Sequence, residues 1–272
     1  MNFILKLQKA CQDNDSFLCV GLDPDPRLMP SNIDPDEFIL RVVEATSDLV
    51  CAYKINFAFF EAMGENSFQH LKFARNCIPA RIPVIADAKR ADIGNTSRGY
   101  AEAIFGIMGF DAITVNPYMG FDSILPFISY TDHGVFILCR TSNPGAQDFQ
   151  DLNVINGTDT IPLYQMVSRK AQEWNQHGNI GLVVGATWPE EIKYIRKQNP
   201  DMPLLIPGIG TQGGSVELVS KYAIGTEGKI AIINSSRSII HASCEADYSS
   251  KARVKAEELR NQINQYRRKT SS

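Results

Sequence analysis

The chain has 272 residues, of which 44% are hydrophobic, and its formal net charge is −3. That amount of apolar material can form one α/β domain or two smaller ones. The only basic cluster is a short terminal patch at 267–269, and no apolar run approaches the roughly 20 residues that span a bilayer. We therefore expect neither a nucleic-acid partner nor a membrane partner.

Six cysteines are scattered along the chain without C-x-x-C pairs, at positions 11, 19, 51, 77, 139 and 244. Several of them lie inside apolar runs, which is typical of reduced core residues in a cytoplasmic protein. The first residues, MNFILKLQKACQDN, lack a long apolar segment followed by small residues. We expect no secretory signal and a cytoplasmic location.

Short apolar runs recur along the whole chain. They cover residues 16–23, 49–56, 81–89, 111–118, 134–142, 179–187, 203–210 and 229–237. Most of them are too continuous for a strand with one face in water, so they predict parallel strands that are covered on both sides.

Longer segments with helical spacing separate these runs. Clear examples are 34–49, 57–77, 161–178 and 188–199. Pro189, followed by two glutamates, favours the first turn of a helix. Eight strand–helix units predict a (β/α)8 TIM barrel, formed as one domain by residues 1–272. The alternative is an open doubly wound sheet.

Polar residues gather where the predicted strands end. They are Asp23, Lys54, Asn56, Asp87, Lys89, Asn116, Thr141 and Ser142, followed by the loops PGIGTQGG and NSSRS. The carboxyl ends of all barrel strands meet on one face, so these residues should converge there in an active site. The least regular segment, 143–160, is long for a loop, which favours a cover over that site.

The third strand ends in a cluster of charges. Asp87 and Lys89 are two residues apart on a strand and should point to the same side, within reach of Lys54. Such an array can stay ionised when partly buried, and its lysine can stabilise developing negative charge and deliver a proton. The alternative is a salt-bridge network that only holds the strand ends together. Asp92 and Thr96 lie beyond the strand, where helix capping is the alternative explanation.

The last two strands are followed by loops suited to phosphate. The glycines of 207–214 allow close approach of the backbone, and Gln212 can donate a hydrogen bond. Arg237 in the next loop can bind a phosphate with two nitrogens. Phosphate sites after strands 7 and 8 recur in barrels, although glycines also make plain turns. The pattern lacks the GK[ST] of a nucleotide P-loop.

Several of these motifs together resemble one family. They are AYKINFAFFE, DAKRADIGNT, TSNPGA, PGIGTQGG and SSRSI. The chain is similar to the orotidine 5′-phosphate decarboxylase family in its longer bacterial form, over residues 16–240. The resemblance implies a TIM barrel that converts orotidine 5′-phosphate to UMP, the last step of de novo pyrimidine nucleotide synthesis, without a cofactor.

The resemblance also implies roles for individual residues. The charged array is Lys54, Asp87, Lys89 and Asp92, in which Lys89 protonates C6 of the pyrimidine and Asp87 lies beside the substrate carboxylate. The implied substrate contacts are Asp23 and Lys54 to the ribose, Ser142 to the pyrimidine, and Gln212, Arg237 and the amides near Gly210 and Ser236 to the phosphate. Asp92 and Thr96 would reach the ribose bound by a neighbouring subunit, so the resemblance implies a homodimer with shared sites.

Two other functions stay open. A magnesium-dependent sugar-phosphate decarboxylase or aldolase on the same barrel would resemble this pattern, but those enzymes carry a glutamate where this chain has Lys54. A phosphate-ligand sensor without activity would not need Lys89 beside Asp87. We see no pattern for pyridoxal phosphate or a metal, and the four histidines look like ordinary surface or helix residues.

Overall fold

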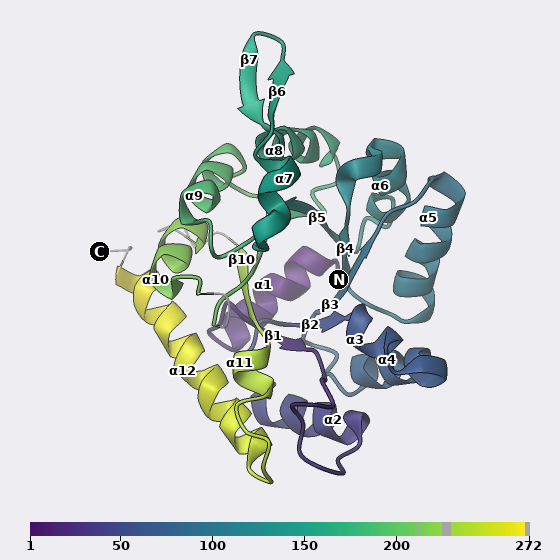
Figure 1. Ribbon diagram of the computed structural model, residues 1–272, viewed down its shortest axis with the longest axis vertical. Helices are drawn as coiled ribbons and strands as arrows, with labels where there is room; N and C mark the ends of the chain where they lie inside the picture. The colour runs from purple at the N-terminus through teal and green to yellow at the C-terminus, as the bar shows by residue number, and fades with distance from the viewer. Residues whose placement is uncertain (211–212, 225–229, 270–272) are drawn as a thin grey trace.

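Eight parallel strands close into a barrel in the computed structural model, which describes residues 1–210, 213–224 and 230–269 (Figure 1). The strands are β1 (Leu18–Leu22), β2 (Ala52–Asn56), β3 (Val84–Arg90), β4 (Ala112–Val115), β5 (Gly134–Arg140), β8 (Ile180–Val184), β9 (Leu204–Pro207) and β10 (Ala231–Ser235). Their order is β1-β10-β9-β8-β5-β4-β3-β2. Each predicted strand is present, and because the sheet is closed the TIM barrel is confirmed and the open sheet is wrong.

Helices surround the barrel. They are α1 (Phe3–Asp13), α2 (Pro35–Thr46), α3 (Phe57–Glu61), α4 (Ser67–Asn76), α5 (Gly94–Ala101), α6 (Phe121–Ile128), α7 (Gln147–Gln150), α8 (Leu163–Trp174), α9 (Pro189–Gln198), α10 (Val216–Val219), α11 (Arg237–Ile240) and α12 (Tyr248–Lys269). Short 3-10 segments cover Gly64–Asn66, Pro117–Met119 and Pro144–Ala146, and π-helical turns cover Glu102–Ile107 and Ser220–Ile224. Pro189 does begin α9, as expected.

The predicted helix at 57–77 is broken into two. Helix α3 ends at Glu61 and α4 begins only at Ser67. Between them Gly64 has φ +81°, a left-handed conformation that glycine adopts without a Cβ clash. The apolar spacing of the segment did not reveal this break, because a helical pattern can continue across a short turn.

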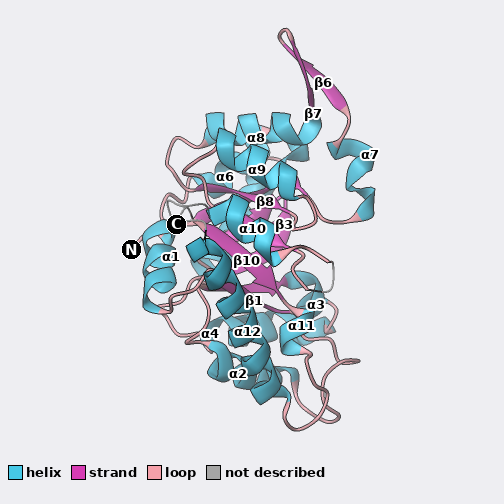
Figure 2. Ribbon diagram, turned by 90° about the vertical axis from the view of Figure 1, so that its left-hand side faces the viewer, coloured by secondary structure: helices cyan, strands magenta, loops and turns pink. Residues whose placement is uncertain are grey.

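The barrel interior is apolar at its amino end. Alternate residues of the strands point inward, and the inward set includes Cys19, Ala52, Ile85, Ala112, Phe136, Val183, Leu205 and Ile232. Phe3 and Leu7 of α1 pack onto this set, and the rings of Phe3 and Phe136 meet edge to face at 5.7 Å. Helix α1 therefore plugs the amino end, and Figure 2 shows it on the side of the barrel opposite α7.

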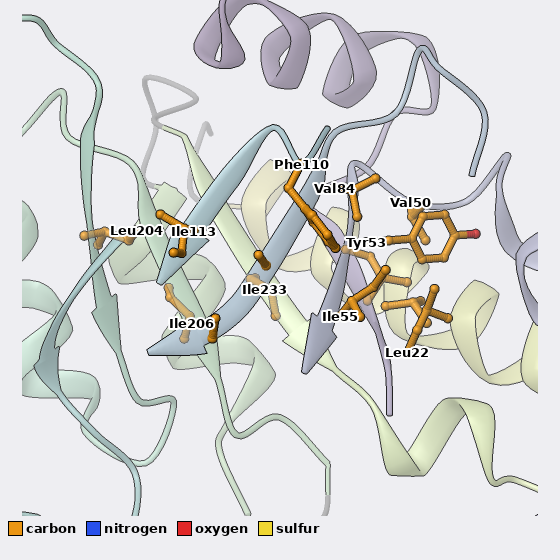
Figure 3. Close-up of a cluster of buried hydrophobic side chains, with 14 of the residues drawn as sticks. Leu22, Val50, Tyr53, Ile55, Val84, Phe110, Ile113, Leu204, Ile206 and Ile233 are labelled. Atoms are coloured by element: carbon orange, nitrogen blue, oxygen red, sulfur yellow. The ribbon is translucent and has the colours of Figure 1, made fainter. Parts of the chain in front are cut away.

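The other side chains of the strands point outward into the layer between sheet and helices. Figure 3 shows members of this layer, among them Leu22, Tyr53, Ile55, Ile206 and Ile233. Each of these five is at most 1% exposed. Full burial of one such apolar side chain contributes about 1.5–3 kcal/mol, so this layer supplies much of the stability that fixes the strand ends.

Segment 143–160 is more regular than its sequence suggested. After the 3-10 turn at Pro144–Ala146 and helix α7, strands β6 (Asn153–Asn156) and β7 (Asp159–Pro162) form an antiparallel hairpin. Gly157 in the two-residue turn has φ +64°, as tight hairpin turns of this length require. The hairpin projects away from the barrel in both ribbon views (Figures 1 and 2). Asn143 and Gln150 of this segment line a cavity at the strand ends, whereas no residue of the hairpin does.

All six cysteines are free. Cys19, Cys51 and Cys139 are buried, but Cys244 is exposed in the loop before α12, so the expectation of a core position is wrong for that residue. None of the helices in the described ranges is long and apolar enough to cross a membrane.

Candidate active site

A cavity of about 720 Å3 opens at the carboxyl ends of the barrel strands. Nine of the residues that the sequence singled out for the site line it, namely Asp23, Lys54, Asn56, Asp87, Lys89, Thr141, Ser142, Ser236 and Arg237, whereas Asn116 is not among the lining residues. They come from strands or loops far apart in the chain, and the closed barrel brings them together. The inward-pointing Leu138, Val183 and Leu205 form an apolar part of its wall.

Two salt bridges form the charged core of the site. Lys54 Nζ donates to Asp87 Oδ2 at 2.7 Å, and Lys89 Nζ donates to Asp87 Oδ1 at 2.6 Å. Lys54 is 4% exposed and Asp87 is 9% exposed, whereas the Lys89 side chain is 49% exposed. The Asp87 carboxylate thus binds two ammonium groups. That of Lys54 is buried in the wall of the cavity, and that of Lys89 lies on a half-exposed side chain at its mouth.

Regular strand alternation does not explain the contact of Lys89 with Asp87, because the backbone at the end of β3 is irregular. The pairing of β3 with β4 shifts between Ala86 and Arg90, and Lys89 has φ +48°, which is unusual and strained for a lysine. Its backbone N–H donates to Thr114 Oγ1 at 3.0 Å, and that hydroxyl donates to Asp87 Oδ1 at 3.0 Å. Thr114 therefore fixes both residues, although the sequence analysis did not single it out.

In the folded protein the pKa of Asp87 is lowered and the pKa of Lys54 is raised. Burial alone would raise the pKa of Asp87, but attraction to Lys54 and Lys89 and their hydrogen bonds outweigh it, and the pKa lies well below its usual range. Burial alone would lower the pKa of Lys54, but attraction to Asp87 and Asp23 outweighs it and raises that pKa. The pair is therefore ionised throughout the neutral range.

The neighbouring wall, at the ends of β1 and β10, carries polar atoms without partners among the described residues. Asp23 Oδ1, Asn234 Oδ1 and Ser236 Oγ are buried and have no hydrogen-bond partner among the described residues. All three residues line the cavity. Buried polar groups are nearly always paired in native proteins, so these atoms are candidates for ligand contacts. Asn234 was part of the NSSRS motif in the sequence, but it was given no role.

The two loops that the sequence predicts to bind phosphate lie side by side. Ser235 Oγ donates to the carbonyl oxygen of Ile209 at 3.2 Å. Gly210 has φ +95°, and a Cβ there would lie 2.6 Å from Ser238 Oγ, so only glycine fits. Gly208 and Ile209 line the cavity, but the predicted Gly210 is not among the lining residues. Gln212 lies outside the described residues.

Asp92 and Thr96 are not among the residues that line the cavity of this chain. Asp92 Oδ1 accepts a hydrogen bond from the N–H of Ile93 at 2.7 Å, just before α5. Thr96 is exposed in the first turn of that helix. The N-cap of α5 is Ile93, which makes no side-chain capping bond, so the hydrogen bond of Asp92 is not a helix cap. The role of Asp92 and Thr96 in the site of a neighbouring subunit stays a prediction.

His241 is not the ordinary surface residue that the sequence suggested. Its ring stacks on Phe38 at 5.4 Å, and its Nε2 donates to the carbonyl oxygen of Asp23 at 3.1 Å. His241 therefore holds the backbone at Asp23, directly after β1. No local sequence pattern predicts this contact, because His241 and Asp23 are more than two hundred positions apart.

Comparisons with known proteins agree with this geometry. The family model "Orotidine 5′-phosphate decarboxylase / HUMPS family" matches residues 16–251. The chain is 46% identical over 269 residues to an orotidine 5′-phosphate decarboxylase of Dehalococcoides mccartyi, with 99% of this chain and 100% of that protein covered. For the corresponding protein of Cupriavidus necator the identity is 48% over 274 residues, with 98% and 99% covered.

Solved structures agree as well. The structure of Leishmania donovani OMP decarboxylase has a TM-score of 0.86 and 37% identity, and the match covers 98% of this chain and 99% of that one. Leishmania donovani UMP synthase has a TM-score of 0.88 and 39% identity, with 98% of this chain but 57% of that longer chain covered. The chain belongs to the orotidine 5′-phosphate decarboxylase family.

Proposed function

We propose that this chain decarboxylates orotidine 5′-phosphate to UMP and that Lys89 is the proton donor. The observation that carries the proposal is the array in which Asp87 bridges Lys54 and Lys89 at the wall of the cavity. A carbanion at C6 of the pyrimidine needs a fixed cation beside it and then a proton. Lys89, half exposed at the cavity mouth, can supply both.

The proposed step breaks the bond between C6 and the carboxylate carbon. Carbon dioxide leaves, and the electron pair of the broken bond stays on C6. The Lys89 ammonium stabilises this pair and transfers one proton to it, which gives the C6–H bond of UMP. Neutral Lys89 regains its proton from water, to which its side chain is 49% exposed.

Asp87 holds the array in place for this step. Its two oxygens accept from Lys54 and Lys89, so the Lys89 ammonium points at one spot before the substrate arrives. Its negative charge also lies beside the substrate carboxylate in the proposed complex and favours the departure of that charge. Both effects use the ionised form of Asp87, which the low pKa maintains.

The rest of the substrate binds to the other walls in this proposal. Ser142 contacts the pyrimidine, Asp23 and Lys54 contact the ribose, and Arg237 with the amides near Gly210 and Ser236 holds the phosphate. These contacts are remote from the breaking bond, so their binding energy serves to place C6 against Lys89. The unpartnered atoms Asp23 Oδ1 and Ser236 Oγ support these assignments.

The magnesium-dependent alternative is not favoured. Lys54 Nζ already occupies Asp87 Oδ2 at 2.7 Å and would repel a cation at that carboxylate. Loss of activity in EDTA and its recovery with Mg²⁺ would revive this alternative. The proposed reaction uses only groups of the chain itself, and we place it in the cytoplasm, where the six free cysteines stay reduced.

The decisive experiment is turnover of orotidine 5′-phosphate by the purified chain. The loss of ultraviolet absorbance is followed, and UMP is identified by chromatography. We expect one UMP for each substrate consumed. Absence of UMP at high protein concentration would refute the proposal and leave a ligand sensor as the better explanation.

We also propose a homodimer in which each site receives Asp92 and Thr96 from the partner. Support comes from exposed apolar side chains near these two residues: Ile93 is 58% exposed, Tyr118 84% and Met119 45%. Ile93 directly precedes α5, which packs against α6, and Met119 lies just before α6. Large exposed apolar side chains that gather in one region are typical of an interface.

Mixing two inactive variants tests this arrangement. Lys89→Ala and Asp92→Ala dimers are combined and allowed to exchange subunits. A mixed dimer then contains one intact site, so random exchange should restore about one quarter of wild-type activity. If the sites are not shared, mixing restores nothing, and light scattering separately reports whether the chain is a dimer.

A further inference from the structure

Helix α7 is clamped to the end of β5 by one glutamine. Thr141 N–H donates to Gln150 Oε1 at 2.9 Å, and Gln150 Nε2 donates to Thr141 Oγ1 at 2.8 Å. Both polar atoms of the Gln150 side chain therefore bind the same residue. Thr141, Ser142 and Gln150 all line the active-site cavity, so the clamp lies at its rim.

The carbonyl oxygen of Thr141 accepts a hydrogen bond from a second loop. Trp188 Nε1, from the loop after β8, donates to Thr141 O at 2.9 Å. The Thr141 hydroxyl in turn donates to Asn143 Oδ1 at 2.7 Å. The backbone N–H, the backbone oxygen and the hydroxyl of Thr141 are thus all fixed, two of them by Gln150 and one by Trp188.

Arg140 contacts Trp188 and also Asp151, the residue that follows Gln150. It is 1% exposed, its guanidinium lies 3.8 Å from the centre of the Trp188 ring, and its Nη2 donates to Asp151 Oδ2 at 3.1 Å. Its Nε and Nη1 are buried and without a partner among the described residues. A buried cation with open N–H groups lowers stability, which an apolar side chain of similar size would not do. Arg140 therefore needs another explanation than stability.

Ser142 is confined by the same elements. Gly185 donates its N–H to Arg140 O at 2.7 Å, and a Cβ at Gly185 would lie 2.8 Å from Ser142 Cβ and 2.9 Å from Ser142 N. The backbone of β8 therefore packs directly against Ser142. With Thr141 held on one side and Gly185 in contact on the other, the backbone of Ser142 is confined at the edge of the cavity.

We propose that Gln150 and Arg140 are positioning residues that fix the Thr141–Ser142 edge against which the pyrimidine base is recognised. Gln150 acts through Thr141, and Arg140 acts through Trp188 and Asp151; neither touches the reacting atoms. This inference rests on the proposed function. It predicts that loosening the clamp weakens contacts to the base and leaves the phosphate end intact.

The test compares two ligands that differ only at the base end. UMP contains the pyrimidine, and ribose 5-phosphate offers the ribose and phosphate without it. Gln150→Ala should weaken UMP binding about three- to ten-fold, as expected for lost hydrogen bonds, and change the affinity for ribose 5-phosphate less than two-fold. KM for orotidine 5′-phosphate should rise by a similar factor, with a smaller change in kcat.

Two further variants complete the experiment. Gln147→Ala changes an exposed glutamine in the same helix and should alter neither affinity. Arg140→Met should show the Gln150→Ala pattern of affinities without a lower melting temperature. Unchanged UMP affinity in Gln150→Ala, or equal losses for both ligands, would overturn the inference. Turnover by the wild-type chain is measured alongside, so that failure of the proposed function itself is recognised separately.

Discussion

The two walls of the cavity solve the problem of buried polar groups in opposite ways. On the β2–β3 wall, Lys54, Asp87 and Lys89 satisfy one another at 2.6–2.7 Å. On the β1–β10 wall, Asp23 Oδ1 and Asn234 Oδ1 are buried without a partner among the described residues. The first wall is complete before a ligand binds, and the second is completed only by a ligand.

This difference separates two tasks. Fixed charges that need no reorganisation lower the energy of a transition state, so the paired wall suits chemistry. Open hydrogen-bonding groups lower the stability of the empty protein and gain a partner on binding, so the open wall suits recognition. Substitutions on the paired wall should therefore reduce turnover or stability, and substitutions on the open wall should reduce affinity.

The largest expected effect is at Lys89. Lys89→Ala removes both the cation beside C6 and its proton, and we expect kcat to fall by a factor of roughly 10⁴ or more. UMP should still bind, since the other walls are intact. Stopped assays at high enzyme concentration measure the residual rate, and Lys72→Ala, at an exposed lysine of α4, is the control. A kcat within ten-fold of wild type would remove Lys89 from its proposed role.

Asp87→Asn should destabilise the fold. It leaves the ammonium of Lys54 buried without its carboxylate, which costs about 3–5 kcal/mol in comparable cases. Urea unfolding measures the change in free energy, with Asp132→Asn at an exposed position as the control. If the variant were as stable as wild type, the pairing of Lys54 with Asp87 would not contribute to the stability of the fold.

The same pair sets the pH dependence of stability. The pKa of Asp87 is lower in the folded state, so its contribution is fully present above its unfolded value near 3.9 and is lost as pH falls through the folded pKa. The pKa of Lys54 is raised, so its contribution is present below about 10.5 and is lost only as pH rises beyond that. Between about pH 5 and 9 neither group should change the free energy of unfolding, whereas below pH 4 the wild type should lose stability faster than Asp87→Asn.

Arg237→Ala should weaken binding of UMP about ten- to a hundred-fold, because a charge-assisted contact to phosphate is lost. Affinity for uridine, which has no phosphate, should not change. Calorimetric titration of the two ligands gives both numbers. An unchanged affinity for UMP would place the phosphate elsewhere in the cavity.

Asn234→Ala should have the smallest effect of these substitutions. The directions in which it changes stability and affinity distinguish a ligand-binding role of the open wall from a structural one. The substitution removes a buried oxygen that has no partner in the described part of the chain, so the melting temperature should stay the same or rise. UMP affinity should fall about three-fold or more, since the ligand loses that partner. A drop in stability without loss of affinity would mean that the open wall is structural, and the contrast between the two walls would disappear.

The sequence by itself predicted the eight strands and most of the polar rim, whereas the closed barrel was chosen over the open sheet only by the tertiary structure. Continuous apolar runs favour strands covered on both sides, and the residues that end them meet on one face once the sheet closes. Asp87 and Lys54 follow from this rule, because alternation turns both inward. The break at Gly64 and the hairpin at 153–162 did not follow, since local spacing does not report where a chain turns or what it packs against.

Only the tertiary structure decided how the rim works. The strained backbone of Lys89, the role of Thr114 and the contact of His241 with Asp23 depend on neighbours distant in sequence. The same holds for the clamp of Gln150 on Thr141 and for the buried Arg140 behind it. Residue types fix which groups reach the cavity, but the distances between those groups, and therefore their charge states and partners, are set by packing across the whole barrel.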